Sequence, residues 1–165
     1  MPDKIYNDVY EIDYGELIKK GIKGLIFDID NTLVPYSLPG PTLEISGLMQ
    51  KLKEDGLGVC FVSNNKKERV EIFNRTFGFP AFYAAGKPKK KYMKRALEVM
   101  GTAPCNTAVI GDQLFTDICA GKRMKMLSLL VMPIEPVETL FFKLKRVLEK
   151  PLIKRYKKLQ TRTTK

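Results

Sequence analysis

The chain has 165 residues, 44% of them hydrophobic, which is enough apolar material for the core of one domain and leaves no room for a second. Three widely spaced cysteines, an acidic amino terminus and the absence of a membrane-length apolar run exclude a disulfide scaffold, a signal peptide and a membrane span, so we expect a cytoplasmic protein or one attached peripherally at the inner membrane face. The formal net charge of +11 favours an anionic partner.

The first buried strand is predicted at residues 25–27 (Leu-Ile-Phe), and two acidic residues follow it. No polar residue interrupts this run, which is typical of a strand at the centre of a parallel sheet. Asp28 and Asp30 come at its carboxyl end, where open α/β sheets bind ligands. Because residues two apart in an extended segment point the same way, we expect both side chains at one spot.

Two carboxylates at one spot repel each other unless a divalent cation binds them or one keeps its proton. Either outcome serves an enzyme. The alternative is structural, because Asp-Asn-Thr at residues 30–32 also suits a turn that caps the next segment.

A second buried strand is predicted at 57–62, and it leads into Ser63 and Asn64. A helix is predicted directly afterwards, at 66–74. Hydroxyl, amide and backbone N–H groups at the start of a helix form a natural anion site. An ordinary helix cap by Ser63 is the alternative.

A third short strand, at 82–85, is followed by Lys87. Its place directly after a strand predicts that Lys87 turns inward, although it could be one more solvated lysine beside those at 89–91. A fourth strand, at 107–110, ends in Asp112, and Asp117 follows in the first turns of the next element. Asp117 could face the cleft or cap that helix.

Strand and helix alternate five times, which predicts a three-layer, doubly wound α/β fold around a parallel five-stranded sheet, with right-handed crossovers and no large cap domain. We expect a single domain over residues 1–165, with a leading segment at 1–21 and a basic carboxyl-terminal segment at 141–165. The remaining predicted elements are helices near 14–20, 42–53 and 89–100, a short helix closing at 120–121, a strand at 126–132 and a helix at 135–149.

Together the four strand ends resemble the signature motifs of the haloacid-dehalogenase-like (HAD) superfamily, over about residues 22–133. These motifs are Asp-x-Asp-x-Thr, a strand-end Ser or Thr, a Lys, and Gly-Asp with a downstream Asp. Residues 27–34 (Phe-Asp-Ile-Asp-Asn-Thr-Leu-Val) and 111–117 (Gly-Asp-Gln-Leu-Phe-Thr-Asp) look like the YqeG-like branch of its subclass III phosphatases.

The resemblance implies a phosphatase that hydrolyses a phosphate monoester through an aspartyl-phosphate. It makes Asp28 the nucleophile and Asp30 the general acid and base. It also implies a Mg²⁺ cofactor, held by a carboxylate oxygen of Asp28, the backbone carbonyl of Asp30, and Asp112. An acid two residues after the nucleophile goes with phosphatases and phosphotransferases in this superfamily, rather than with dehalogenases.

The resemblance gives the other motif residues supporting roles. Ser63 and Asn64 would bind the phosphoryl oxygens, and Lys87 would balance their charge and take part in catalysis. Thr32 and Asp117 would lie in a second layer around the site.

The spacing of the motifs leaves no room for a cap domain, so we expect an open cleft that suits a large substrate or a homo-oligomer whose partner subunit covers it. The YqeG-like branch is similar to phosphatidylglycerophosphate phosphatases. Residues 141–165 carry ten Lys or Arg and one Glu, so this segment could bind an anionic phospholipid membrane or nucleic acid. A solvated, frayed tail is the alternative.

Three other functions stay open at this point. The substrate could be a nucleotide or a nucleic-acid end. The chain could be a receiver domain, although the phosphorylated Asp of that class lies on the third strand, where only Gly86 and Lys87 are found here. It could also be a non-catalytic binding protein associated with RNA or the ribosome through its basic segment.

Overall fold

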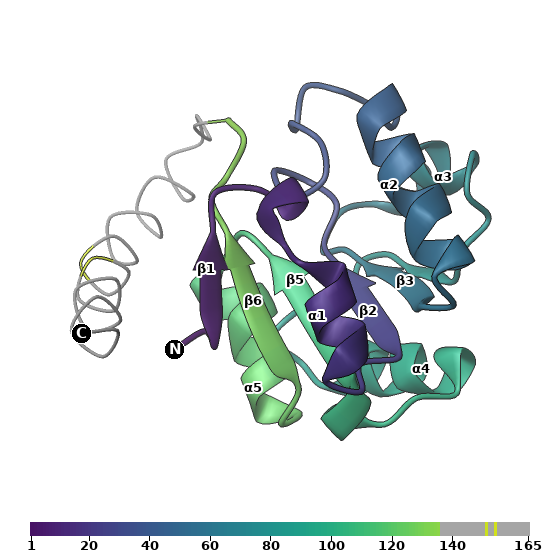
Figure 1. The fold of residues 1–165 in the computed structure, drawn as a ribbon. Coiled ribbons are helices and arrows are strands. Elements are labelled where there is room, and N and C mark those ends of the chain that lie inside the picture. The colour runs from purple at the N-terminus through teal and green to yellow at the C-terminus, as the bar shows by residue number, and fades with distance from the viewer. Residues whose placement is uncertain (136–150, 152–153, 155–165) are drawn as a thin grey trace.

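The computed structural model describes residues 1–135, 151 and 154, and its centre is a parallel sheet (Figure 1). The sheet has six strands in the order β1-β6-β5-β2-β3-β4. Every neighbouring pair is parallel. The strands are β1 (Lys4–Tyr6), β2 (Gly24–Phe27), β3 (Gly58–Val62), β4 (Ala81–Phe82), β5 (Thr107–Gly111) and β6 (Leu127–Val131).

The predicted fold class is confirmed, but the sheet has six strands rather than five. The additional strand is β1, which lies in the leading segment and pairs with β6, Lys4 opposite Leu129. Asp3 reinforces this edge, because its backbone N–H donates to the Ser128 carbonyl at 2.8 Å and its carboxylate accepts from the Ser128 N–H at 2.8 Å. Three residues are too few to show a hydrophobic period, so tertiary pairing forms this strand and the local sequence does not predict it.

Helices cover both faces of the sheet, in three layers (Figure 1). The α-helices are α1 (Tyr14–Lys19), α2 (Leu43–Glu54), α3 (Lys67–Asn74), α4 (Lys91–Met100) and α5 (Cys119–Arg123). Two 3-10 helices, at Val9–Glu11 and Pro104–Asn106, and a π-helix at Leu114–Ile118 complete the described elements. Each predicted helix that lies among the described residues is present within a few residues of its expected position.

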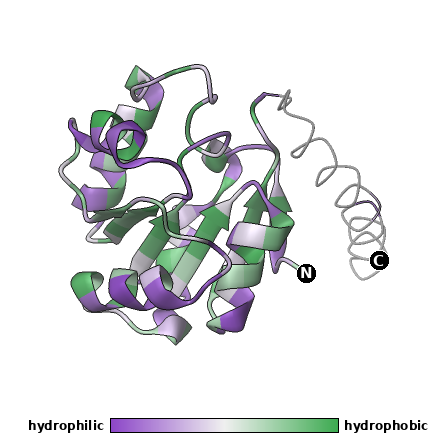
Figure 2. Cartoon of the chain, turned by 180° about the vertical axis from the view of Figure 1, so that it is seen from behind, coloured by the Kyte–Doolittle hydropathy of each residue, from purple (hydrophilic) through white to green (hydrophobic). Residues whose placement is uncertain are grey.

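The central strand β2 is buried on both faces, and its side chains pack alternately into two separate hydrophobic cores. Leu25 and Phe27 pack with the apolar residues of α1, α2 and α3. Ile26 points the other way and packs with those of α4 and α5. Figure 2 shows the result as hydrophobic strands in the middle with hydrophilic segments on the outer helices.

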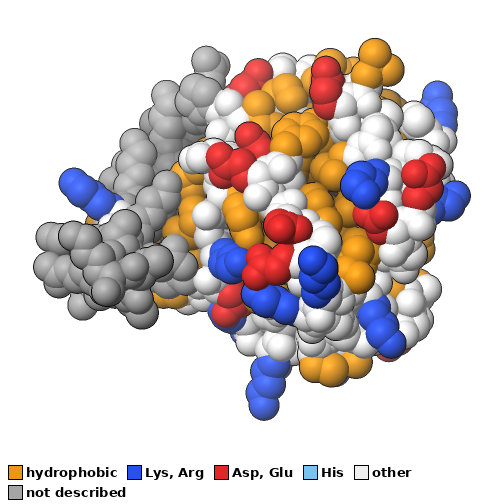
Figure 3. Space-filling view, viewed as in Figure 1, with side chains coloured by type: hydrophobic (Ala, Val, Ile, Leu, Met, Phe, Trp, Pro, Cys, Tyr) orange, Lys and Arg blue, Asp and Glu red, His pale blue; other side chains and the backbone are white. Residues whose placement is uncertain are grey.

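The exposed face that carries α1 and α2 shows acidic and basic side chains close together (Figure 3). On α1, for example, Glu16 pairs with Lys4 at 3.3 Å and with Lys20 at 2.5 Å. Exposed pairs of this kind add little to stability. Among the described helices none has the length and apolarity needed to cross a bilayer. The helix predicted at 135–149 and nearly all of the basic segment at 141–165 lie outside the described residues.

The chain order of the strands places a ligand site at the centre of the sheet. From β2 the chain moves outward through β3 and β4, and it then returns to the other side of β2 to form β5 and β6. The direction of winding therefore reverses between β2 and β5. Crevices outside the carboxyl ends of strands at such a switch point are where open α/β sheets bind ligands.

Candidate active site

The polar residues that follow β2 and β5 lie side by side because these two strands are neighbours. The Asp28 N–H donates to the Ile110 carbonyl at 3.0 Å, which extends the pairing of the strands to their carboxyl ends. Asp28 and Asp112 therefore emerge at the same point, and both are buried. Thr32, predicted to support the site, donates from its hydroxyl to Asp112 Oδ1 at 3.3 Å.

Three carboxyl groups form a buried cluster at this point. Asp28, Asp112 and Asp117 each offer an oxygen, and these oxygens lie within 4.8 Å of one another. Lys87 supplies the opposite charge, since its Nζ is 2.8 Å from Asp28 Oδ1 and 2.6 Å from Asp117 Oδ1. Converging carboxylate oxygens are the ligands that Mg²⁺ prefers, so the residues present fit this ion.

The charges in the cluster depend on burial and on each other. Burial raises the pKa of Asp28 well above its usual range, and the nearby Asp117 and Asp112 act in the same direction, whereas Lys87 opposes them. Burial would lower the pKa of Lys87, but the carboxylates of Asp117 and Asp28 outweigh this effect, so the pKa of Lys87 is raised. The Lys87 ammonium is therefore charged at neutral pH. With three acidic groups and one basic group, the cluster favours a further cation.

The position of Asp117 comes from the π-helix at Leu114–Ile118, which the sequence does not predict. Asp117 Oδ2 accepts from the Gln113 N–H at 3.1 Å, while Oδ1 contacts Lys87. The sequence allowed Asp117 either to cap this helix or to face the cleft. In the structure its side chain stabilises the start of the helix and also faces the cleft. Short π-helical turns are frequent at functional sites.

Gly111 lets Asp117 lie against the end of β5. A Cβ added at Gly111 would be 2.4 Å from the Cβ of Asp117 and 2.5 Å from its Cγ. We therefore expect Gly111→Ala to lower the free energy of unfolding by about 1–3 kcal/mol, the usual cost of overpacking. The control is Gly47→Ala on α2, where nothing lies within 4 Å of the new methyl group and the helix should gain slightly. Urea denaturation measures both, and equal stabilities for the two variants would contradict this account of Gly111.

Asn64 and Ser63 extend the site from the end of β3. Asn64 holds the backbone of Lys87 on both sides: its Oδ1 accepts from the Lys87 N–H at 2.7 Å, and its Nδ2 donates to the Lys87 carbonyl at 3.4 Å. Ser63 is buried, and its hydroxyl oxygen accepts from the Asn65 N–H at 3.0 Å. Asn64 thereby fixes the loop that directs Lys87 toward the carboxylates.

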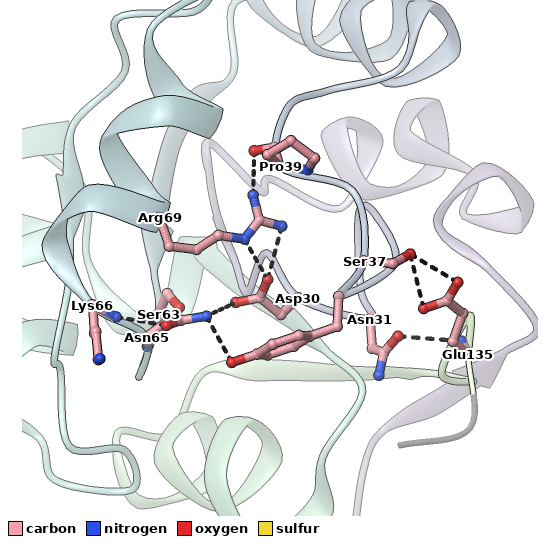
Figure 4. A network of polar contacts seen from close by, with 10 residues as sticks. Asp30, Asn31, Ser37, Pro39, Ser63, Asn65, Lys66, Arg69 and Glu135 are labelled. Atoms are coloured by element: carbon pink, nitrogen blue, oxygen red, sulfur yellow. Dashed lines mark hydrogen bonds and ion pairs between the residues drawn. The ribbon is translucent and has the colours of Figure 1, made fainter. Parts of the chain in front are cut away.

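The Asp30 carboxyl group has different partners from that of Asp28 (Figure 4). Arg69 Nε and Nη2 lie 2.9 and 2.8 Å from Asp30 Oδ1, and Asn65 Nδ2 donates to Asp30 Oδ2 at 3.0 Å. Beyond Asp30 the chain turns, with Asn31 at a φ of 61°.

A pocket nevertheless joins the two acids at the carboxyl edge of the sheet. Its lining includes the predicted Asp28, Asp30, Ser63 and Asn64, while Lys87 and Asp112 adjoin it because both lie close to Asp28. The complete lining is Asp28, Asp30, Asn31, Tyr36, Ser63, Asn64, Asn65 and Gln113.

Tyr36, Asn65 and Arg69 belong to this region but carry little signal in the sequence. Tyr36 lies in a loop that is marked only by its prolines. Arg69 stands in the charged helix predicted at 66–74, where a basic residue is typical of a solvated face. For Asn65 the sequence signal is that two asparagines, and not one, follow Ser63.

The class of protein that this fold and site define is that of the HAD-like hydrolases, and the family described as HAD-hydrolase-like matches residues 84–133. Over 158 residues the chain is 33% identical to "Probable phosphatase YqeG" of Bacillus subtilis (strain 168), covering 96% of this chain and 92% of that protein. The chain therefore belongs to the HAD-like family, in its YqeG-like branch, and is a phosphoric monoester hydrolase. The predicted family is confirmed.

Two further relatives extend this picture. The chain is 29% identical over 168 residues to phosphatidylglycerophosphate phosphatase 1, chloroplastic/mitochondrial, of Arabidopsis thaliana, covering 94% of this chain and 48% of that protein. A crystal structure of a mutant CbbY from Rhodobacter sphaeroides, in complex with xylulose-1,5-bisphosphate, has a TM-score of 0.55 at 14% identity and covers 68% of this chain and 87% of that one. At this identity the second likeness concerns the fold alone.

Proposed function

We propose that this phosphatase depends on Mg²⁺, acts through an aspartyl-phosphate on Asp28, and takes a phospholipid phosphate monoester such as phosphatidylglycerophosphate as its substrate. The observation that supports this most is the buried cluster of Asp28, Asp112 and Asp117 against Lys87 at the switch point of the sheet. Phosphate monoesters are inert because a nucleophile must approach a charged phosphoryl group in line with the leaving oxygen. A buried nucleophile next to fixed positive charge meets that requirement.

The donor set fits the proposed ion. Asp28, Asp112 and the backbone carbonyl of Asp30 would hold Mg²⁺, and Asp117 lies close enough to Asp28 and Asp112 to contribute an oxygen or a hydrogen bond. When bound, the ion neutralises charge on the phosphoryl oxygens and helps to orient them.

The remaining chemistry belongs to side chains of this chain. A carboxylate oxygen of Asp28 attacks phosphorus, and the bond from phosphorus to the ester oxygen breaks. Asp30 gives a proton to the leaving oxygen. It then takes a proton from a water molecule, which attacks the aspartyl-phosphate, releases phosphate and restores Asp28. Lys87, Ser63 and nearby N–H groups hold the phosphoryl oxygens and balance their charge.

Three observations favour a lipid substrate. The chain resembles phosphatidylglycerophosphate phosphatase 1 over nearly its whole length. Between Thr32 and Thr42 it forms a loop and not an inserted domain, so the pocket is open to a headgroup at a membrane surface. The basic segment at 141–165 would attract anionic lipid.

The test measures phosphate release from phosphatidylglycerophosphate in mixed micelles, with Mg²⁺ and after chelation by EDTA. We expect turnover to fall to background with EDTA and to return when Mg²⁺ is added. We also expect kcat/KM at least about tenfold higher than for a nucleoside monophosphate, which corresponds to roughly 1.4 kcal/mol of transition-state stabilisation. Turnover that survives chelation would contradict the metal dependence. A preference for the nucleotide or for an oligonucleotide 5′-phosphate would replace the lipid by the second candidate substrate.

A further inference from the structure

We propose that Arg69 is a positioning residue, whose guanidinium fixes the Asp30 carboxylate and the loop at 35–41 relative to each other so that Asp30 meets the leaving oxygen of the substrate. This rests on the proposed function, because it assigns a role to the partner of the residue that would carry the proton. Asp30 itself would touch the substrate, and Arg69 would act through it.

The guanidinium group binds two segments at once. Arg69, on the first turn of α3, contacts Asp30 Oδ1 with both Nε and Nη2, at 2.9 and 2.8 Å, and donates from Nη1 to the Pro39 carbonyl. Figure 4 shows the planar group between Asp30 on one side and Pro39 on the other. An arginine fork can make such contacts together, whereas the single ammonium group of a lysine cannot reproduce their geometry.

The second oxygen of Asp30 is held from the same direction. Asn65 Nδ2 donates to Asp30 Oδ2 at 3.0 Å and lies 3.3 Å from the Tyr36 hydroxyl oxygen. Each carboxylate oxygen of Asp30 therefore has a donor that also contacts the loop at 35–41. Asp30 cannot rotate without breaking contacts to both Arg69 and Asn65.

This ion pair differs from ordinary surface pairs on the same helix. The Arg69 and Asp30 side chains are only 14% and 12% exposed, and Asp30, Tyr36 and Asn65 all line the pocket that contains Asp28. By contrast, the Lys67 and Glu71 side chains are 61% and 59% exposed and are 3.6 Å apart. When a reacting group is already held in the right orientation, the activation free energy is lower. A fixed Asp30 therefore contributes more to the reaction rate than to the stability of the fold.

The dependence on the leaving group tests this role. A positioned proton donor matters most when the leaving oxygen is strongly basic, and such a donor contributes about 10²–10⁴-fold to rate. We expect Arg69→Met to lower kcat/KM for glycerol 3-phosphate by roughly 10²-fold or more, and for p-nitrophenyl phosphate by less than about threefold, because kcat/KM covers the steps up to loss of the leaving group and nitrophenolate leaves without a proton. kcat should fall for both compounds, because it also includes hydrolysis of the aspartyl-phosphate, in which Asp30 activates the water molecule.

Two comparisons separate positioning from a purely structural effect. Asp30→Asn should show the same selective loss, and the double variant Asp30→Asn with Arg69→Met should be no slower than Asp30→Asn alone, since the two residues act as one unit. Lys67→Met, which removes an exposed cation from the same helix, should leave kcat for both compounds unchanged.

Arg69→Lys provides a second variant if Arg69→Met fails to fold, because it keeps the charge and loses the fork. It should show the same selective loss for glycerol 3-phosphate. Equal losses of kcat/KM with both phosphates, or a double variant whose losses multiply, would overturn the proposed role of Arg69. A wild-type protein that releases phosphate from neither compound and not from phosphatidylglycerophosphate would instead overturn the proposed function, and this role with it.

Discussion

Asp28→Asn is expected to abolish phosphate release while it raises the stability of the metal-free protein. The substitution removes the nucleophile, so kcat should fall by roughly 10⁴-fold or more, as it does when other enzymes lose theirs. It also removes one of three crowded carboxyl groups that share a single ammonium group. Relief of such a functional strain commonly adds about 0.5–2 kcal/mol to the free energy of unfolding. Urea denaturation without metal and a phosphate assay with Mg²⁺ measure the two effects.

The stability gain should depend on pH in a defined direction. Because burial raises the pKa of Asp28, the folded protein binds that proton more tightly than the unfolded chain does. The contribution of Asp28 to the stability of the metal-free wild type should therefore decrease as the pH rises above about 4, the ordinary pKa of Asp. Asp28→Asn lacks this proton, so its advantage over the wild type should shrink as the pH falls toward 4.

The control for Asp28→Asn is the same substitution at Asp55, an exposed residue at the end of α2 that pairs with Lys51 at 2.9 Å. Asp55→Asn should keep wild-type turnover and change stability by less than about 1 kcal/mol. Substantial turnover by Asp28→Asn would remove Asp28 from the mechanism. A marked loss of stability in that variant would show that the carboxylate is needed for folding.

Lys87→Met is expected to abolish turnover as well, but with the opposite effect on stability. It leaves the carboxyl groups of Asp28 and Asp117 buried without the cation that lies 2.8 and 2.6 Å from them. Breaking a buried ion pair on one side costs about 3–5 kcal/mol. Because the two carboxylates raise the pKa of Lys87, its contribution is present at all pH values below about 10 and is lost only at higher pH.

Added Mg²⁺ gives Lys87→Met a second measurable property. A divalent ion that binds the folded cluster stabilises it by mass action, and removal of the competing ammonium group should strengthen this binding. We expect 10 mM Mg²⁺ to increase the melting temperature of Lys87→Met more than that of the wild type. Lys89→Met, which removes an exposed lysine two residues away, should match the wild type in turnover, stability and response to Mg²⁺. If 10 mM Mg²⁺ left the melting temperature of Lys87→Met unchanged, this result would contradict the cluster as a cation site.

The parts of the fold that the sequence predicts are those encoded by local patterns. Apolar runs mark β2, β3, β5 and β6, although Ser128 interrupts the last of them, and polar residues after β2, β3 and β5 mark the site. β1 has no such pattern, because three residues with an exposed lysine become a strand only by pairing with a distant partner. β4 shrinks to two residues for a related reason, since the chain turns at Ala84, where φ is 44°.

Within the site, sequence spacing identifies residue types but not the partner of each side chain. It identifies Asp28, Lys87 and Asp112, because these residues follow strands and their positions depend only on the order of the strands. It does not reveal that Arg69 reaches back 39 residues to Asp30, because a basic residue on a charged helix looks the same whether it is solvated or paired. It also does not reveal the π-helix that brings Asp117 to Lys87.

The pairing of β1 with β6 has a consequence for how the protein is made. Asp3 bonds to Ser128, 125 residues further along the chain, so β1 is synthesised long before its partner strand β6 exists. Until then the edge of β5 that β6 will cover is open to other chains, and closure of so long a loop is slow. A chaperone that shields this edge should therefore improve the yield of folded protein.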